Sequence, residues 1–230
     1  MKDFSRLEKK LDITFKNQDL LRQAFVHRSY INENPGFELG HNERLEFLGD
    51  AVLELVVTEH LYQTYPNPEG ELTNWRASLV NSHMLAKAAH DLGLETYLYL
   101  SKGEAKDTNS KARNYILANC FEAFVGALYL DHGYTASKKF IHAVLIPELA
   151  DILSTQSYLD PKSRFQEVAQ EKLGITPSYR VLKESGPDHS KKFNVGVYLG
   201  EDLIASSTGS SKQEAQVKAA ALALKKKQWQ

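Results

Sequence analysis

The sequence changes its hydrophobic period once, near residue 154, and this change constrains the fold more than any other feature. Before it, apolar residues recur three and four positions apart in long runs, which is the spacing of amphipathic helices. After the polar stretch STQSYLDP, three runs with strand-like composition lie between two helical segments. We therefore predict an all-helical domain of residues 1–153, a linker of residues 154–160 and a small α-β-β-β-α domain of residues 161–228.

The expected elements follow from these patterns. In the first domain, helices are predicted on both sides of a loop at residues 14–17 and over residues 42–62, 74–92, 111–130 and 136–153. In the second, helices over residues 161–173 and about 211–227 flank the strands SYRVLKES, KKFNVGVYLG and DLIASSTG. Pro161 suits the first turn of its helix. Gly200 and Glu201 predict a tight turn between the last two strands.

Charge is distributed unevenly along the chain. The net charge is −1, yet residues 154–230 hold 12 Lys and Arg against 8 Asp and Glu, so about +4, and the remainder holds 16 against 21, so about −5. A basic tail on an acidic body indicates a polyanionic partner, although ordinary variation between domains would give the same pattern. No apolar run reaches the roughly 18 residues of a membrane span, so no membrane partner is expected.

The single cysteine limits both the chemistry and the compartment. Cys120 stands alone, so an intramolecular disulfide and a CxxC metal site are excluded. A reducing, cytoplasmic location is the resulting expectation.

The stretch HNERLEFLGDAVLELVV carries carboxylates within the most apolar predicted helix. Glu43, Glu46 and Asp50 stand at i, i+3 and i+7, so they project from nearly one helix face. Like charges on one stripe repel, and partial burial raises their cost. A hard divalent cation would favour this arrangement. The alternative is an exposed acidic stripe paired with Arg or Lys, and Glu54, next on the stripe, is expected to be structural.

A second apolar helix, YILANCFEAFVGALYLD, presents Asn119 and Glu122 at i and i+3. Two such helices could enclose a metal site, although Asn-x-x-Glu alone is a weak signal. Other chemistries lack their motifs, since there is no GxSxG, P-loop, GxGxxG or HExxH. The HNE triplet also lacks the PCxxC partner that a zinc deaminase requires.

These stretches together resemble a known family. ERLEFLGDA, with AFVHRSY before it and PEGELTNWRASLVNSHMLA and ILANCFEAFVGALYLD after it, resembles the ribonuclease III family in order and spacing. The C-terminal unit, with GPDHSKKF and STGSSKQEA, is similar to a double-stranded RNA-binding domain. The resemblance implies hydrolysis of double-stranded RNA to 5′-phosphate and 3′-hydroxyl ends, with Mg2+ as cofactor and Mn2+ able to substitute. It also implies a role in processing ribosomal and messenger RNA precursors.

The resemblance further implies roles for individual residues. The metal ligands would be Glu46, Asp50, Asn119 and Glu122, with Asp50 and Glu122 as the catalytic residues. Two further carboxylates of the cleft would be Glu43 and Glu69. The RNA-binding residues of the second domain would be Gln166, Glu167, His189, Ser211 and Lys212.

The chain departs from the family pattern at Asn119, where the usual residue is aspartate. Asparagine can ligate Mg2+ through its side-chain carbonyl but supplies no charge, so weaker metal occupancy is expected. Three explanations stay open: a natural variant that still cleaves, an engineered inactive variant, and a chain that binds double-stranded RNA without cutting it. A second departure is the single basic residue in SSKQEA, where many relatives have two, and this predicts weaker RNA binding.

A homodimer is expected because one active centre cuts one strand, and a twofold axis supplies the second centre. The candidate interface is the face around Phe47, Leu48, Gly49 and Val52. Gly49 costs roughly 1 kcal/mol within a helix relative to alanine, so a close helix contact is expected there. The alternative is that this face packs inside its own monomer.

Overall fold

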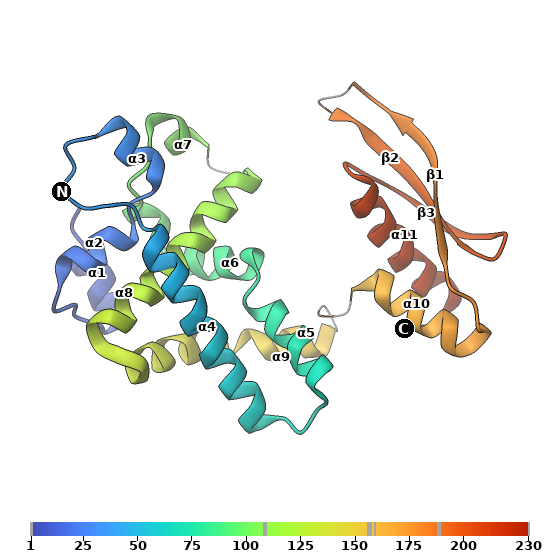
Figure 1. The fold of residues 1–230 in the computed structure, drawn as a ribbon, viewed down its shortest axis with the longest axis horizontal. Helices are drawn as coiled ribbons and strands as arrows, with labels where there is room; N and C mark the ends of the chain where they lie inside the picture. The colour runs from blue at the N-terminus through green and yellow to red at the C-terminus, as the bar shows by residue number, and fades with distance from the viewer. Residues whose placement is uncertain (1, 108–109, 156–157, 159, 188–189, 230) are drawn as a thin grey trace. The chain divides into compact units, whose positions relative to one another are not determined.

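The computed structural model describes residues 2–107, 110–155, 158, 160–187 and 190–229. They form two compact units, Met1–Tyr158 and Leu159–Gln230, shown in Figure 1. The predicted order of a helical domain followed by an α-β-β-β-α domain is confirmed. The predicted domain limits, with the first domain ending at residue 153, a linker of residues 154–160 and the second domain beginning at residue 161, stay a prediction.

The first unit is built from helices. They are α1 (Ser5–Leu11), α2 (Gln18–Ala24), α3 (Arg28–Glu33), α4 (Glu43–Thr64), α5 (Glu69–Leu79), α6 (Ser82–Leu92), the 3-10 helix η1 (Leu94–Tyr97), α7 (Lys102–Lys106), α8 (Lys111–Val144) and α9 (Glu148–Thr155). Among the described residues of this unit, extended pairing is limited to one parallel bridge between Val26 and Tyr99. The expectation that strands are rare here is therefore confirmed.

Two long helices, α4 and α8, lie side by side at the centre of this unit (Figure 1). A Cβ atom added at Gly49 of α4 would lie 1.7 Å from the carbonyl oxygen of Glu122, and one added at Gly126 of α8 would lie 2.2 Å from that of Leu45. The two backbones therefore touch with no room for a methyl group. The close contact expected at Gly49 lies inside the monomer, and Val52 is buried there as well.

Aromatic side chains fill the core behind this contact. Phe25, Phe121 and Phe124 are fully buried, and the ring of Phe140 lies with its centroid 5.2 Å from that of Phe124. Full burial of such a side chain stabilises the fold by roughly 1.5–3 kcal/mol. The core therefore fixes how α8 lies against α4.

The predicted single helix over residues 74–92 was wrong. The structure has α5 ending at Leu79 and α6 beginning at Ser82. The side chain of Asn81 accepts a hydrogen bond from the backbone N–H of Met84 at 2.9 Å, which caps α6. An asparagine N-cap supplies the acceptor that the first turn of a helix lacks, so a new helix begins there although the apolar spacing continues.

The predicted helix over residues 136–153 missed a break near its C-terminal end. The break before it is present, because α8 is interrupted at Gly133, a non-helical residue whose φ of 77° is open to glycine but strained for other residues. This part of α8 then ends at Val144. α9 then begins at Glu148, directly after Pro147. Proline has no N–H to continue the helix, which explains the break.

The second unit packs two helices on one face of a three-stranded sheet. Its elements are α10 (Pro161–Leu173), β1 (Ser178–Ser185), β2 (Lys192–Leu199), β3 (Asp202–Gly209) and α11 (Lys212–Lys227). The strands are antiparallel in the order β1-β2-β3. Phe165 of α10, Val197 of β2 and Ala219 of α11 are fully buried between the layers. The predicted turn at Gly200 is confirmed, with a φ of 62°.

Candidate active site and nucleic-acid interface

The start of α4 is held in place by a buried asparagine. Asn42 donates from its side-chain amide to the carbonyl of Ala24 at 3.1 Å and from its backbone N–H to the carbonyl of Val26 at 2.8 Å. Its own carbonyl accepts from the backbone N–H of Glu46 at 2.9 Å. These bonds fix the first turn of α4, where Glu46 is half-buried and Asp50, one turn further, is exposed.

Helix α8 brings the second pair of predicted ligands against this turn. Asn119 and Glu122 are both half-buried on α8. The carbonyl oxygen of Glu122 lies against Gly49, the residue next to Asp50. The contact between the two glycine-bearing backbones therefore determines how near the two halves of the site come to each other.

The carboxylates of this site perturb one another. The pKa of Glu122 is raised to about 8, first by burial and then by the charges of Asp50 and Glu46. The pKa of Glu46 is also raised, first by burial and then by the charge of Glu43, while a hydrogen bond from Asn119 opposes the shift. The structure thus brings together all four residues that were predicted to be metal ligands.

The chemistry of these donors fits a hard divalent cation. Carboxylate and amide oxygens are the ligands that Mg2+ prefers, and a cation would offset both the burial and the repulsion that raise the pKa of Glu122. Among the described residues, no three His, Cys, Asp or Glu side chains already lie in an arrangement that holds a metal ion. A cation at this site would therefore require these side chains to lie closer together than the structure places them.

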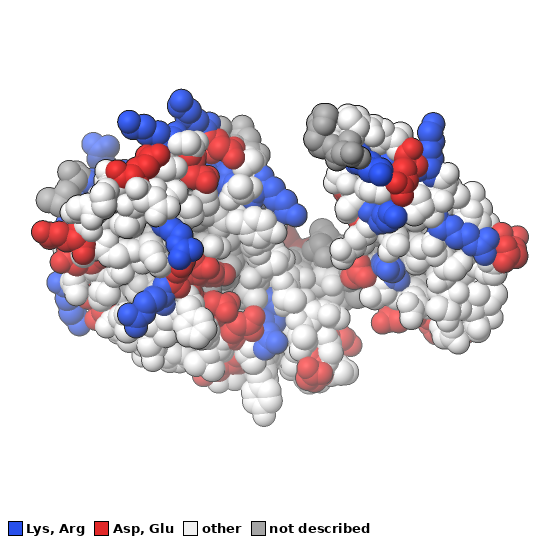
Figure 2. All heavy atoms as spheres, turned by 45° about the horizontal axis from the view of Figure 1, so that its top comes forward, with Lys and Arg blue, Asp and Glu red and all other residues white. Residues whose placement is uncertain are grey.

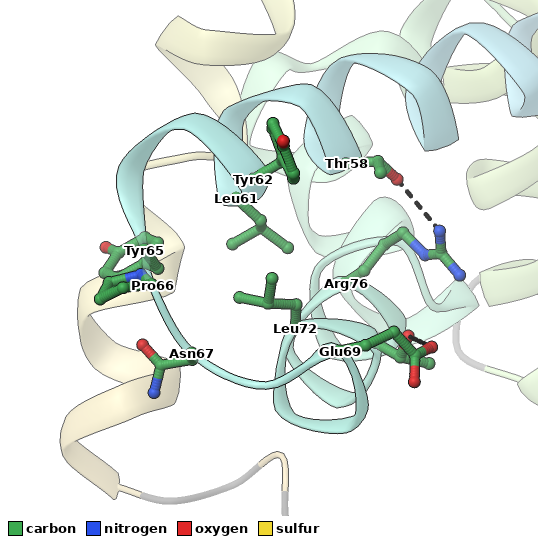
Figure 3. A pocket seen from close by; sticks show the side chains of 10 residues that line it. Thr58, Leu61, Tyr62, Tyr65, Pro66, Asn67, Glu69, Leu72 and Arg76 are labelled. Carbon is green, nitrogen blue, oxygen red and sulfur yellow. Dashed lines mark hydrogen bonds between the residues drawn. The ribbon is translucent and has the colours of Figure 1, made fainter.

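The two predicted cleft carboxylates are not brought together within one chain. Glu43, the first residue of α4, lies 3.3 Å from the Nε atom of Arg28. Glu69, the first residue of α5, accepts a hydrogen bond from the Thr73 hydroxyl at 2.9 Å and lines a cavity that also includes Thr58 (Figure 3). Thr58 is 15 residues along α4 from Glu43, so roughly 22 Å of helix separates the two regions.

Arg76, whose role was not predicted from the sequence, links α5 to α4. Its Nε atom lies 2.8 Å from the Glu54 carboxylate, and its Nη1 atom donates to the Thr58 hydroxyl at 3.0 Å. The structural role predicted for Glu54 is consistent with this ion pair.

The start of α11, which carries the predicted RNA-binding residues Ser211 and Lys212, has an acidic neighbour that pairs with one of them. Ser211 caps the helix by accepting a hydrogen bond from the backbone N–H of Glu214 at 3.1 Å. The Lys212 ammonium lies 3.3 Å from the carboxylate of Glu184, which also pairs with Lys191 at 3.1 Å. A phosphate at this end would compete with Glu184 for both lysines.

The other predicted RNA-binding residues lie elsewhere in the second unit. Gln166 and Glu167 are exposed side by side on α10, where they are open to a ligand. His189 lies outside the described residues. Figure 2 shows acidic side chains gathered near the middle of the visible face of the first unit, with basic side chains beside them.

Comparisons with known proteins agree with this two-part organisation. The Ribonuclease-III-like family model matches residues 17–149, and the double-stranded RNA binding motif matches residues 161–227. The chain belongs to the ribonuclease III family. Ribonuclease 3 of Enterococcus faecalis is 44% identical over 222 residues, which are 96% of each chain. Ribonuclease 3 of Borreliella burgdorferi is 43% identical over 222 residues, which are 96% of this chain and 90% of the relative.

A solved structure supports the assignment of the first unit. The nuclease domain of the Campylobacter jejuni ribonuclease III, described for flexibility in a region involved in dimer formation, matches with a TM-score of 0.55 and 34% identity over 63% of this chain and 97% of that domain. The chain is therefore an endoribonuclease with a double-stranded RNA-binding domain. The alternative of a binding protein that does not cut is not favoured. None of the described helices is long and apolar enough to cross a membrane.

Proposed function

We propose that this chain cleaves double-stranded RNA by Mg2+-dependent hydrolysis, leaving 5′-phosphate and 3′-hydroxyl ends. The supporting observation is the backbone contact of α4 with α8 beside Asp50, where a Cβ atom added at Gly49 would lie 1.7 Å from the carbonyl oxygen of Glu122. The pKa of Glu122 is raised to about 8, first by burial and then by the charges of Asp50 and Glu46, which agrees with this placement. Such mutually repelling carboxylates destabilise a protein unless a cation or a proton joins them. Family membership supports the same conclusion, since ribonuclease III enzymes are generally metal-dependent.

The residues proposed to hold Mg2+ are Glu46, Asp50, Asn119 and Glu122. The bound ion would activate water and stabilise the leaving 3′-oxygen. Asp50 and Glu122, as the catalytic residues, orient the reacting groups from opposite helices. Asn119 would ligate the ion through its side-chain carbonyl oxygen, so the site would carry one negative charge fewer than a site with four carboxylates.

Replacing Glu122 by alanine tests this proposal. Glu122→Ala should abolish cleavage of a long RNA duplex in Mg2+ and in Mn2+, because the α8 half of the site loses its only carboxylate. Binding of the same duplex, measured by fluorescence anisotropy in EDTA, should change by less than about twofold, because the second unit is untouched. Cleavage at the wild-type rate would contradict the assignment.

We also propose a homodimer formed through the first unit. Phe47, Leu55 and Leu130 are 80%, 57% and 53% exposed, which is unusual for large apolar side chains. Two hollows beside them, of about 640 and 400 Å3, share Leu48 as a lining residue. This surface keeps Phe47 and Leu48 of the interface that was predicted from the sequence. It leaves out Gly49 and Val52, which are buried within the monomer. If sedimentation of the protein at about 10 µM, the range of dissociation constants of weak dimers, showed only the monomer, that result would contradict the proposed homodimer.

The cellular role belongs to the same proposal. The bacterial Ribonuclease 3 relatives support processing of ribosomal and messenger RNA precursors, and the single buried Cys120 supports a cytoplasmic location. We propose residues 154–160 as the linker between the domains, since one family match ends at residue 149 and the next begins at residue 161. Accumulation of uncut precursors after depletion of the protein would support the processing role, and unchanged RNA lengths would contradict it.

A further inference from the structure

Two lysines of the second unit converge on a single carboxylate. The Nζ atom of Lys191 lies 3.1 Å from the Oε2 atom of Glu184, and the Nζ atom of Lys212 lies 3.3 Å from its Oε1 atom. The same two Nζ atoms lie 5.9 and 5.5 Å from the centroid of the Phe193 ring. We call these four residues the Glu184 cluster. Its lysines come from separate elements, because Lys191 directly precedes β2 and Lys212 is the first residue of α11.

The sheet and the last helix build this cluster together. Glu184 of β1 pairs with Phe193 of β2, which pairs in turn with Gly209 at the end of β3. Residues that pair across neighbouring antiparallel strands project from the same face of the sheet. A Cβ atom added at Gly209 would lie 2.6 Å from the backbone nitrogen of Ala215, so the first turn of α11 lies directly against the end of the sheet. This contact brings Lys212, which follows β3, to a carboxylate of β1 on the far side of β2.

One positive charge of the Glu184 cluster is left over. The two ammonium groups each contact one oxygen of Glu184, which carries a single negative charge. The three charged side chains are between 37% and 57% exposed, and ion pairs as exposed as these contribute little to folding stability. The fold therefore does not depend on this carboxylate, and another anion can take its place between the two lysines.

An RNA phosphate has the chemistry to take that place. It offers oxygens to two donors, as the carboxylate does, and lysine binds phosphate as a point charge. Recognition of double-stranded RNA relies on phosphates and 2′-hydroxyls. The pKa of the Glu184 carboxyl is lowered, first by the hydrogen bond from Lys191 and then by that from Lys212, so the group is charged at neutral pH. A phosphate that approaches either lysine therefore meets a negative charge that already occupies it.

We propose that Glu184 weakens the binding of double-stranded RNA and lowers its salt dependence, because in the free protein it occupies the place of a phosphate between Lys191 and Lys212. This goes beyond the proposed cleavage chemistry, since it rests only on duplex binding through the start of α11. With the carboxylate in place, the cluster offers RNA one net positive charge instead of two. Each phosphate that is neutralised adds about 0.9 to the slope of log affinity against log salt concentration, so the effect of this carboxylate can be measured as a slope.

Glu184→Gln tests the proposal, because glutamine keeps the size of the side chain and removes its charge. The full chain is titrated into a fluorescent RNA duplex of about 20 base pairs, slightly longer than the roughly 16 that one such domain spans. Anisotropy is measured in EDTA at salt concentrations from about 50 to 200 mM. We expect the variant to bind about threefold more tightly than the wild type at the lowest salt concentration, and its slope to be steeper by about one. Urea unfolding should give both proteins nearly the same stability, since the ion pairs are exposed.

Glu201→Gln is the matched control. It also removes an exposed carboxylate of this unit, which pairs with Arg180 at 3.0 Å in the turn at the other end of β2. Its affinity and its slope should stay at the wild-type values. A second control places Glu184→Gln in a chain that also carries Lys191→Gln and Lys212→Gln. No ammonium group of the cluster is then left to hold a phosphate, so the gain in affinity should disappear.

Unchanged or weaker duplex binding by Glu184→Gln would overturn the proposal, because the carboxylate would then not compete with RNA. An equal gain from Glu201→Gln would also overturn it, since the loss of any negative charge in this unit would then have the same effect. A gain that persists without the two lysines would do so as well. All measurements are made without Mg2+, so failure of the proposed cleavage would leave the result unchanged.

Discussion

Replacing Glu122 by glutamine tests the electrostatics of the site most directly. The pKa of this carboxyl is raised from 4.5 to about 8, first by burial and then by the charges of Asp50 and Glu46. A pKa difference of one corresponds to about 1.4 kcal/mol. The full shift would therefore cost at most about 5 kcal/mol of folding stability. Glu122 is only half-buried, so screening by solvent reduces the expected cost to about 2 kcal/mol.

The cost depends on pH in a defined direction. Below about pH 4.5 the carboxyl is protonated in both the folded and the unfolded chain, so it costs nothing. As the pH rises, the unfolded chain loses the proton first, and the folded state is progressively destabilised until about pH 8. Glutamine cannot ionise, so Glu122→Gln should match the wild type near pH 4.5 and be more stable at pH 8.5 by about 2 kcal/mol.

Urea unfolding of both proteins in EDTA at the two pH values measures this difference. Glu38→Gln, which removes an exposed carboxylate of the same unit, is the matched control for the loss of one charge. Addition of Mg2+ at pH 8.5 should stabilise the wild type more than Glu122→Gln. A stability difference that is the same at both pH values would refute the reasoning, because neither burial nor the charges of Asp50 and Glu46 would then disfavour the ionised form of Glu122.

The remaining predictions address other parts of the chain. Asn119→Asp should lower the Mg2+ concentration needed for half-maximal cleavage severalfold, because a charged ligand replaces a neutral one; an unchanged Mg2+ titration would count against a ligand role. Gly126→Ala should destabilise the first unit by about 3 kcal/mol in urea unfolding, because its Cβ would lie 2.2 Å from a carbonyl oxygen of α4. Phe47→Ala should shift sedimentation toward the monomer, since it removes an 80% exposed ring. Lys212→Gln should reduce the salt dependence of duplex binding by about one unit of slope if this lysine meets a phosphate.

Much of the architecture could be predicted because periodicity reports burial. The spacing of apolar residues over α4 and α8 located both helices, and the strand-like composition of KKFNVGVYLG located β2, whose Val197 is buried. The breaks between helices were harder to predict. Between α5 and α6, for example, the apolar spacing continues through residues 80–81, and the cap at Asn81 affects only the first turn of α6. A cap or a positive φ is a property of one residue, and it leaves little trace in a pattern averaged over a helix.

The candidate site was predicted as a set of residue types, and its geometry was not. Spacing placed Glu46 and Asp50 on one helix face, but it could not show how closely Glu122 would approach them. That approach depends on the packing of α4 against α8, which involves residues more than 70 positions apart. The contacts of Arg76 could not be predicted either, because its partners Glu54 and Thr58 lie on a different helix.

The contact between Gly49 and Gly126 has a consequence for how this enzyme can vary. No side chain lies between the two helices at this point, so the peptide backbones alone set the span between the two halves of the site. Substitutions elsewhere in the core cannot lengthen or shorten that span by small steps. Adjustment of the centre must therefore come from the identity of the donor atoms, and the resemblance to the family implies such a change at the proposed ligand Asn119.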